Sequence, residues 1–143
     1  MRDSMRDGFF HQQLQFTRSF KKKLNGELAE VGLFHSQWLV LYCIKKQQPV
    51  TLVDISNYLD VEKPTITRTV KRLREEELVE EAPSRDKREK RLRLTVTGEE
   101  NFERGKQIIT RFETELLEGL SDSDIETTAN TLQFLRKKLN GGD

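Results

Sequence analysis

All three prolines of the chain, Pro49, Pro64 and Pro83, lie between residues 49 and 83. A proline inside a helix removes a backbone donor and clashes with the preceding turn, so the proline-free flanks are open to long helices. In the N-terminal flank, apolar residues recur mostly four positions apart from Phe10 to Val31. The sequence therefore predicts a mainly helical fold that begins with a long helix.

Further helices are predicted by apolar stripes and capping patterns. Residues 36–46 are apolar on most sides, which predicts a helix at the centre of the core. Thr97 with Glu100 resembles a capping box that opens another long helix, and Ser121 with Asp124 starts a last one.

Two shorter helices are expected to meet across a tight turn in the middle of the chain. Thr51 with Asp54 resembles a capping box, and the second helix begins near Lys63 with Pro64 in its first turn. The apolar positions that would lock the two helices are Ile55, Leu59, Val61, Ile66 and Val70. This spacing is typical of a helix-turn-helix, and ordinary helical hairpins show it too.

Between residues 78 and 96 the apolar period changes from helical to two. Leu92, Leu94 and Val96 alternate with polar residues, which predicts a strand, and residues 78–82 supply a partner strand. A helix-turn-helix followed directly by such a hairpin is a winged arrangement. The predicted fold class is mainly α with a small β-hairpin, a winged helix-turn-helix.

Local charge is more informative than the net charge of +1. Residues 63–74 hold five basic side chains and no acidic one, and residues 85–93 hold six basic against two acidic ones. Residues 75–81 form an acidic block between them. Each run is compatible with a solvated face, and the two basic runs also fit a DNA contact.

Composition excludes several other classes of function. One cysteine, Cys43, rules out an internal disulfide framework, and the single histidines His11 and His35 show no metal-ligand spacing. The sequence shows no phosphate loop or nucleophile motif, so we expect neither catalysis nor a cofactor. No apolar run approaches the length of a membrane span, which leads us to expect a cytoplasmic protein.

The helix that begins near Lys63 carries side chains suited to reading DNA. Threonine offers a hydroxyl and a methyl group to base edges, arginine can form two parallel bonds to guanine, and lysine neutralises phosphates. The residues predicted to contact double-stranded DNA are Ser36, Thr51, Lys63, Pro64, Thr65, Thr67, Arg68, Lys71, Arg72, Arg85, Arg88 and Arg91.

The hairpin tip is the predicted wing. Narrow minor grooves attract an inserted arginine, and Arg88 is the candidate. Two roles are open for Asp86. It either supports the wing by holding the Arg88 guanidinium in a bidentate pair, or it caps its own loop.

On these motifs the chain resembles the MarR family of bacterial winged helix-turn-helix regulators. Residues 86–95 look like that family's Asp-x-Arg wing running into a Leu-Thr strand, residues 64–68 are similar to its recognition helix, and residues 37–41 to its second helix. Two positions depart from the family pattern. Asp60 stands where a turn glycine is common, and Glu77 where the recognition helix usually ends in glycine.

The resemblance implies a homodimer assembled by the first and last helices, with a small-molecule pocket between the dimerisation and DNA-binding parts. Residues 1–34 and 98–143 would form the dimerisation region, and residues 35–97 the winged DNA-binding region, in one intertwined domain. If the apolar side chains of the terminal helices stayed exposed to solvent, the apolar patch would be larger than soluble monomers usually tolerate. Alternatively, these helices could fold back on their own subunit. The expected interface residues are Phe9, Phe10, Leu14, Leu117, Leu120, Leu132, Leu135 and Leu139.

For the pocket, the candidates are Phe20, Trp38 and Tyr42, with simple core packing as the alternative. The sequence thus predicts a dimeric, ligand-responsive repressor that binds a pseudo-palindromic operator with half-sites roughly 10 base pairs apart. The alternative is a winged-helix protein-interaction module that does not touch DNA.

Overall fold

The structure is a computed structural model that describes residues 8–83, 86 and 88–142, and it divides into two compact units. The first unit extends to Phe112 and the second begins at Glu113. The helices of the first unit are α1 (Phe9–Leu28), the 3-10 turn η1 (Ala29–Val31), α2 (His35–Gln47), α3 (Leu52–Leu59), α4 (Lys63–Glu75) and most of α5 (Val96–Leu116). Its strands are β1 (Val79–Glu81) and β2 (Leu92–Leu94).

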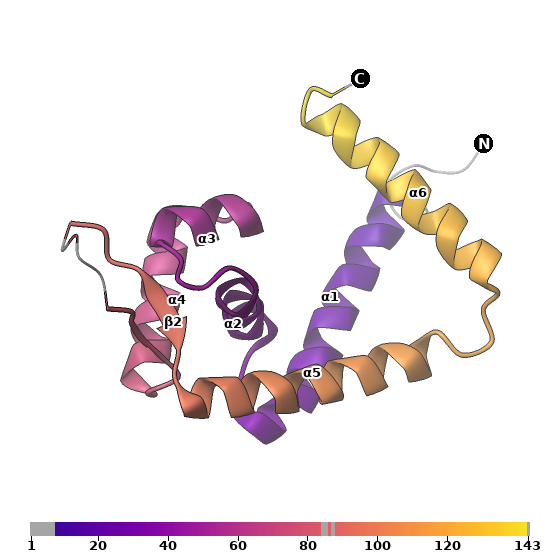
Figure 1. The fold of residues 1–143 in the computed structure, drawn as a ribbon. Helices are drawn as coiled ribbons and strands as arrows, with labels where there is room; N and C mark the ends of the chain where they lie inside the picture. The colour runs from indigo at the N-terminus through magenta and orange to yellow at the C-terminus, as the bar shows by residue number, and fades with distance from the viewer. Residues whose placement is uncertain (1–7, 84–85, 87, 143) are drawn as a thin grey trace. The chain divides into compact units, whose positions relative to one another are not determined.

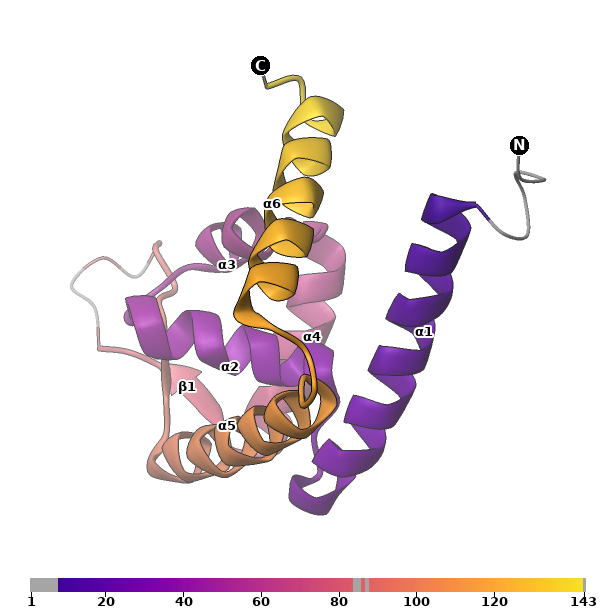
Figure 2. The same cartoon turned by 90° about the vertical axis from the view of Figure 1, so that its right-hand side faces the viewer.

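Helix α2 is the centre of the first unit. It lies between α3 and α5 in both views (Figure 1, Figure 2) and contacts α1, α3, α4 and β2. Its buried residues are Trp38, Val40, Leu41, Cys43 and Ile44. The prediction of a helix buried on most sides is confirmed, because α2 has buried residues along its length and contacts four other elements of the first unit.

Helices α3 and α4 form the predicted helix-turn-helix. Thr51 and Asp54 cap α3 reciprocally, each side chain accepting a hydrogen bond from the other's backbone N–H at 3.2 Å. The chain then turns through Asp60, which adopts the left-handed conformation with φ of 54°. Helix α4 buries Ile66, Val70 and Leu73 against the core, as its apolar spacing predicts.

Helix α4 ends in a tight turn at Glu77, which has φ of 61° without being glycine. The backbone N–H of Glu77 donates to Arg74 and that of Leu78 donates to Leu73, at 3.0 and 2.9 Å. These two bonds form a Schellman motif, which satisfies carbonyl groups left over at a helix end. The buried side chains of Leu73 and Leu78 accompany them, so apolar packing holds a strained residue in place.

Strands β1 and β2 pair antiparallel, with Val79 opposite Leu94 and Glu81 opposite Leu92. The prediction that Val96 continues the strand is wrong, because Val96 is the first residue of α5 and is 77% exposed. Thr95 turns the chain. Its Oγ1 accepts from the N–H of Gly98 at 2.9 Å, so α5 begins before the predicted Thr97 capping box.

The second unit consists of the end of α5, a turn and helix α6 (Asp122–Leu139). Ser121 caps α6 by accepting a hydrogen bond from Asp124 N at 3.1 Å, which confirms its predicted start. None of the residues of α6 is buried. Across the described part of the chain, no helix has the length and apolar character needed to traverse a lipid bilayer.

Candidate nucleic-acid interface

One face of α4 is cationic and open to solvent. Buried Ile66, Val70 and Leu73 fix how the helix is rotated, so the intervening residues point outward. Every side chain predicted to lie on the DNA-reading helix is exposed: Lys63, Pro64, Thr65, Thr67, Arg68, Lys71 and Arg72. The face therefore offers hydroxyl, guanidinium and ammonium groups together.

Two of the α4 guanidinium groups already have partners on the same helix. Arg68 Nη2 donates to Thr65 Oγ1 at 3.3 Å, and Arg72 Nε pairs with Glu76 Oε1 at 2.7 Å. The Arg68 contact aligns two candidate base-reading side chains one helical turn apart. The ion pair with Glu76 holds the Arg72 guanidinium at the C-terminal end of α4.

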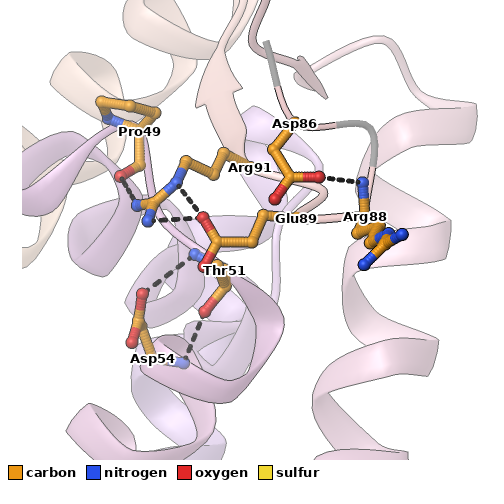
Figure 3. Close-up of polar contacts among 7 residues, drawn as sticks. All are labelled: Pro49, Thr51, Asp54, Asp86, Arg88, Glu89 and Arg91. Atoms are coloured by element: carbon orange, nitrogen blue, oxygen red, sulfur yellow. Dashed lines mark hydrogen bonds and ion pairs between the residues drawn. The ribbon is translucent and has the colours of Figure 1, made fainter. Parts of the chain in front are cut away.

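Asp86 caps the wing loop. Its Oδ1 accepts a hydrogen bond from the backbone N–H of Arg88 at 2.9 Å, as Figure 3 shows, and its carbonyl accepts from Glu89 N at 3.2 Å. Of the two roles left open by the sequence, this contact corresponds to the loop cap. The Arg88 side chain is exposed. Arg85 lies outside the described residues, so the DNA contact predicted for Arg85 stays a prediction.

Arg91 points toward the protein at the base of the wing. Its Nε and Nη2 donate to Glu89 Oε2 at 3.3 and 3.0 Å, and its Nη1 donates to the carbonyl of Pro49 at 3.4 Å (Figure 3). Arg91 is half-buried there. A DNA contact by Arg91, as the sequence predicts, would require these bonds to be exchanged.

The remaining predicted DNA contacts lie at helix starts. Ser36 is exposed in the first turn of α2, and Thr51 is half-buried as the N-cap of α3. Hydrogen bonds from Thr51, with a smaller contribution from the nearby charge of Arg91, lower the pKa of the Asp54 carboxyl below its ordinary value. This keeps Asp54 ionised as the reciprocal cap.

The three aromatic residues predicted to line an effector pocket all lie in or against the hydrophobic core of the first unit. The Trp38 ring stacks on both Tyr42 and Phe102, with ring centroids 5.5 and 5.4 Å away, and Trp38 is only 8% exposed. Phe20 packs against the same core and contacts Phe112, with the two ring centroids 5.6 Å apart. For Trp38 and Tyr42, core packing is what the contacts show, and it is the alternative that the sequence left open.

The residues predicted to form a dimer interface are accessible in each unit taken by itself. On α1, Phe9, Phe10 and Leu14 are more than half exposed. In the second unit, Leu117, Leu120 and Leu139 are exposed, and Leu132 and Leu135 are half-buried.

Two glycines that sequence reasoning did not assign to a role are required by close packing. A Cβ at Gly98 would lie 2.0 Å from the carbonyl oxygen of Leu78, and one at Gly105 would lie 2.5 Å from Trp38 Cδ1. Both glycines face inward on α5, where the period of the helix places them beside buried Phe102 and Ile109. The helical period of the sequence could therefore have identified these two glycines as inward-facing.

Cys43 is fully buried, and burial raises the pKa of its thiol, followed by the negative charge of Asp54. Both effects disfavour the reactive thiolate. Among the described residues, no cluster of side chains has the composition of a metal site.

A helix-turn-helix whose second helix leads into a two-stranded hairpin defines the winged helix-turn-helix class of proteins. The family model "MarR family" matches residues 33–90, which span α2 to the wing loop. A Bacillus subtilis protein described as an uncharacterized HTH-type transcriptional regulator, YwoH, is 44% identical over 124 residues, 87% of this chain and 90% of that protein. The chain belongs to the MarR family.

Solved structures agree with this fold over nearly the full length. Staphylococcus aureus MarR in complex with salicylate and kanamycin is 30% identical, with a TM-score of 0.83 over 94% of this chain and 92% of that one. A S. aureus MepR–DNA complex is 20% identical, with a TM-score of 0.82 over 92% of this chain and 96% of that one.

Proposed function

We propose that this MarR-family transcription regulator is a ligand-responsive repressor that binds a pseudo-palindromic DNA operator as a homodimer. One observation carries the proposal. The exposed face of α4 presents Lys63, Arg68 and Lys71 beside threonine hydroxyls, and residues 63–74 include no acidic side chain. Threonine and arginine suit base edges in the major groove, and lysine suits the phosphates at its margins.

The wing extends the proposed contact. Arg88 is exposed, and the hydrogen bond from its backbone N–H to Asp86 reduces the conformational freedom that Arg88 loses when it meets DNA. We assign Arg88 to the minor groove beside the site that α4 reads. MepR, which shares the fold, was solved as a DNA complex.

The homodimer is proposed from the exposed apolar side chains at both ends of the chain. Phe9, Phe10 and Leu14 on α1 and Leu120 and Leu139 in the second unit would be removed from water in a dimer. Burying side chains of this size contributes about 1.5–3 kcal/mol each before the entropy of association is subtracted. Two-fold symmetry would then place the half-sites roughly 10 base pairs apart.

A response to a small-molecule ligand is proposed from the similarity to a solved protein of the same family. S. aureus MarR, at 30% identity, was solved with salicylate and kanamycin. A ligand that prefers one separation of the two recognition helices would shift the population away from the DNA-binding form. A regulator of this kind acts on the bacterial chromosome, so we place it in the cytoplasm and assign it no catalytic reaction.

The test is to select bound fragments from a random duplex pool with the full chain, and then to measure affinity for the selected site. Enrichment of an inverted repeat is expected. Arg68→Gln should relax discrimination at one base position at a cost of about 1–3 kcal/mol, because the guanidinium contacts a base edge. Arg104→Gln on α5 removes the same charge away from α4 and serves as the control.

Failure to enrich any sequence, with no shift of random duplex at low salt, would overturn the proposal and favour the protein-interaction module. Equal losses in the Arg68 and Arg104 variants would show that binding depends on overall charge and not on the α4 face.

A further inference from the structure

The outer edge of β2 is only partly covered by backbone. β1 pairs with one edge, and on the other edge Val50 exchanges two hydrogen bonds with Leu92, at 3.1 and 2.7 Å. An antiparallel ladder that places Val50 opposite Leu92 would place residue 48 opposite Leu94. The backbone N–H at that position is not free for the ladder, because it donates to the carbonyl of Ile44 at the end of α2.

The side chain of Gln48 supplies the acceptor that a backbone carbonyl would supply in a continued ladder. Its Oε1 accepts a hydrogen bond from the backbone N–H of Leu94 at 3.0 Å. Leu94 is buried, so its N–H has little access to water, and a buried donor without an acceptor is costly. The side-chain carbonyl of Gln48 therefore extends, by one hydrogen bond, the backbone pairing that Val50 makes along the outer edge of β2.

The other end of the same amide reaches helix α5. Gln48 Nε2 donates to Glu99 Oε1 at 3.4 Å, and Glu99 Oε2 pairs with Lys45 Nζ at 2.6 Å. A carboxylate accepts but does not donate, and a backbone N–H donates but does not accept. These two neighbours fix which way the amide is turned, and the amide joins β2 to the first turn of α5.

We propose that Gln48 is a positioning residue for the wing, holding β2 against α5 and the end of α2 so that Arg88 is presented at a fixed place. The inference rests on the proposed function, because it is the DNA contact of Arg88 that the position serves. Strand β2 leads from the wing loop, and its last residue, Leu94, is the one that Gln48 holds. A loosened β2 would let the tip move relative to α4.

The main variant is Gln48→Met, which keeps the length of the side chain and removes both hydrogen bonds. Amide hydrogen exchange at Leu94 should become about tenfold faster or more, because its acceptor is gone. Affinity for the selected operator should fall by about tenfold, a loss within the contribution of one groove contact. Gln47→Met, one residue earlier and exposed, is the matched control and should change neither quantity.

A double-mutant cycle with Arg88→Ala separates positioning from general damage. If Gln48 acts through the wing, Gln48→Met should cost little further affinity once Arg88 has been removed. An equal loss in both backgrounds, or unchanged affinity in Gln48→Met, would overturn the inference while leaving the proposed function standing. Absence of operator binding by the unaltered chain would overturn the proposed function itself.

Exchanging the residues at positions 48 and 99 distinguishes loss of this contact from simple misfolding of a variant. Gln48→Glu keeps the acceptor for Leu94 but sets two carboxylates against each other, so affinity should fall. Adding Glu99→Gln restores a donor–acceptor pair with the roles reversed, and affinity should return to within about twofold of the unaltered chain. Losses that merely add in the double variant would contradict the assigned contact.

Discussion

The indole Nε1 of Trp38 donates a hydrogen bond to the backbone oxygen of Phe102 at 3.1 Å, and the two rings stack with their planes 6° apart. These contacts join α2 to α5 across 64 residues of sequence. Gly105 makes the arrangement possible, because its missing side chain leaves room for the indole ring.

Gly105→Ala should destabilise the first unit by about 1–3 kcal/mol, the usual cost of overpacking a well-filled core. The added Cβ would lie 2.5 Å from Trp38 Cδ1, so the indole must shift. The single tryptophan makes intrinsic fluorescence during urea unfolding the direct measurement. Gly26→Ala on α1, where a Cβ meets nothing within 4 Å, is the control and should be neutral or stabilising by about 0.5–1 kcal/mol.

Glu77→Gly should stabilise the protein by about 0.5–1 kcal/mol. Glu77 has φ of 61°, a conformation that costs an L-residue with a side chain about 1–2 kcal/mol and glycine almost nothing, and the greater freedom of glycine in the unfolded chain offsets part of this gain. Urea unfolding at constant m-value measures the change. Glu75→Gly, two residues earlier inside α4, should have the opposite sign; a loss of stability at both positions would contradict the left-handed turn.

Arg88→Ala should weaken operator binding by about 1–3 kcal/mol if the side chain enters the minor groove. The measurement is fluorescence anisotropy at one fixed salt concentration. Arg88→Lys keeps the charge but not the flat guanidinium, so it should recover only part of the loss. Unchanged affinity in Arg88→Ala would count against the wing contact.

Lys71→Ala should reduce the dependence of log affinity on log salt concentration by about 0.9, the value for one phosphate neutralised on duplex DNA. Affinity is measured over a series of salt concentrations. Lys22→Ala on α1 removes an exposed lysine away from α4 and should leave the slope unaltered. A slope that stays the same in Lys71→Ala would remove this residue from the phosphate contacts.

The free energy of unfolding should decrease as the pH falls through about 6.5, the ordinary His value, partly because of His35. Burial, followed by the charge of Lys21, lowers the pKa of His35 in the folded state, so the unfolded chain binds the proton more readily. His35→Phe keeps a ring stacked on Trp38 without a titrating group, and it should show a shallower decrease between pH 7 and 5. Parallel pH profiles for the two proteins would exclude this contribution.

Features governed by neighbouring residues were accessible from the sequence. The Thr51–Asp54 and Ser121–Asp124 caps involve residues three apart, and the inward side of α4 follows from Ile66, Val70 and Leu73. Local hydrogen bonding and helical period decide such features, so a single sequence contains the information. The wing was predicted for the same reason, through the alternation around Leu92 and Leu94.

Features governed by distant residues were not accessible. Arg91 is directed at Pro49, 42 residues earlier, and Gln48 at Leu94, 46 residues later. The end of β2 was misplaced because the alternation continues to Val96, while the hydroxyl of Thr95 starts a helix. For Arg91 and Gln48 a contact far along the chain decides the geometry, whereas at Thr95 a local helix cap to Gly98 competes with the strand pattern.

The pair between Arg72 and Glu76 changes what a phosphate would gain at this end of α4. The Nε–H of Arg72 already pairs with a carboxylate of the protein at 2.7 Å, so an incoming phosphate would bind the remaining guanidinium N–H groups beside that carboxylate. The Glu76 carboxylate would stand near the duplex and offset part of the attraction. A footprint counted from ionic-strength titrations would consequently include fewer phosphates than the protein touches.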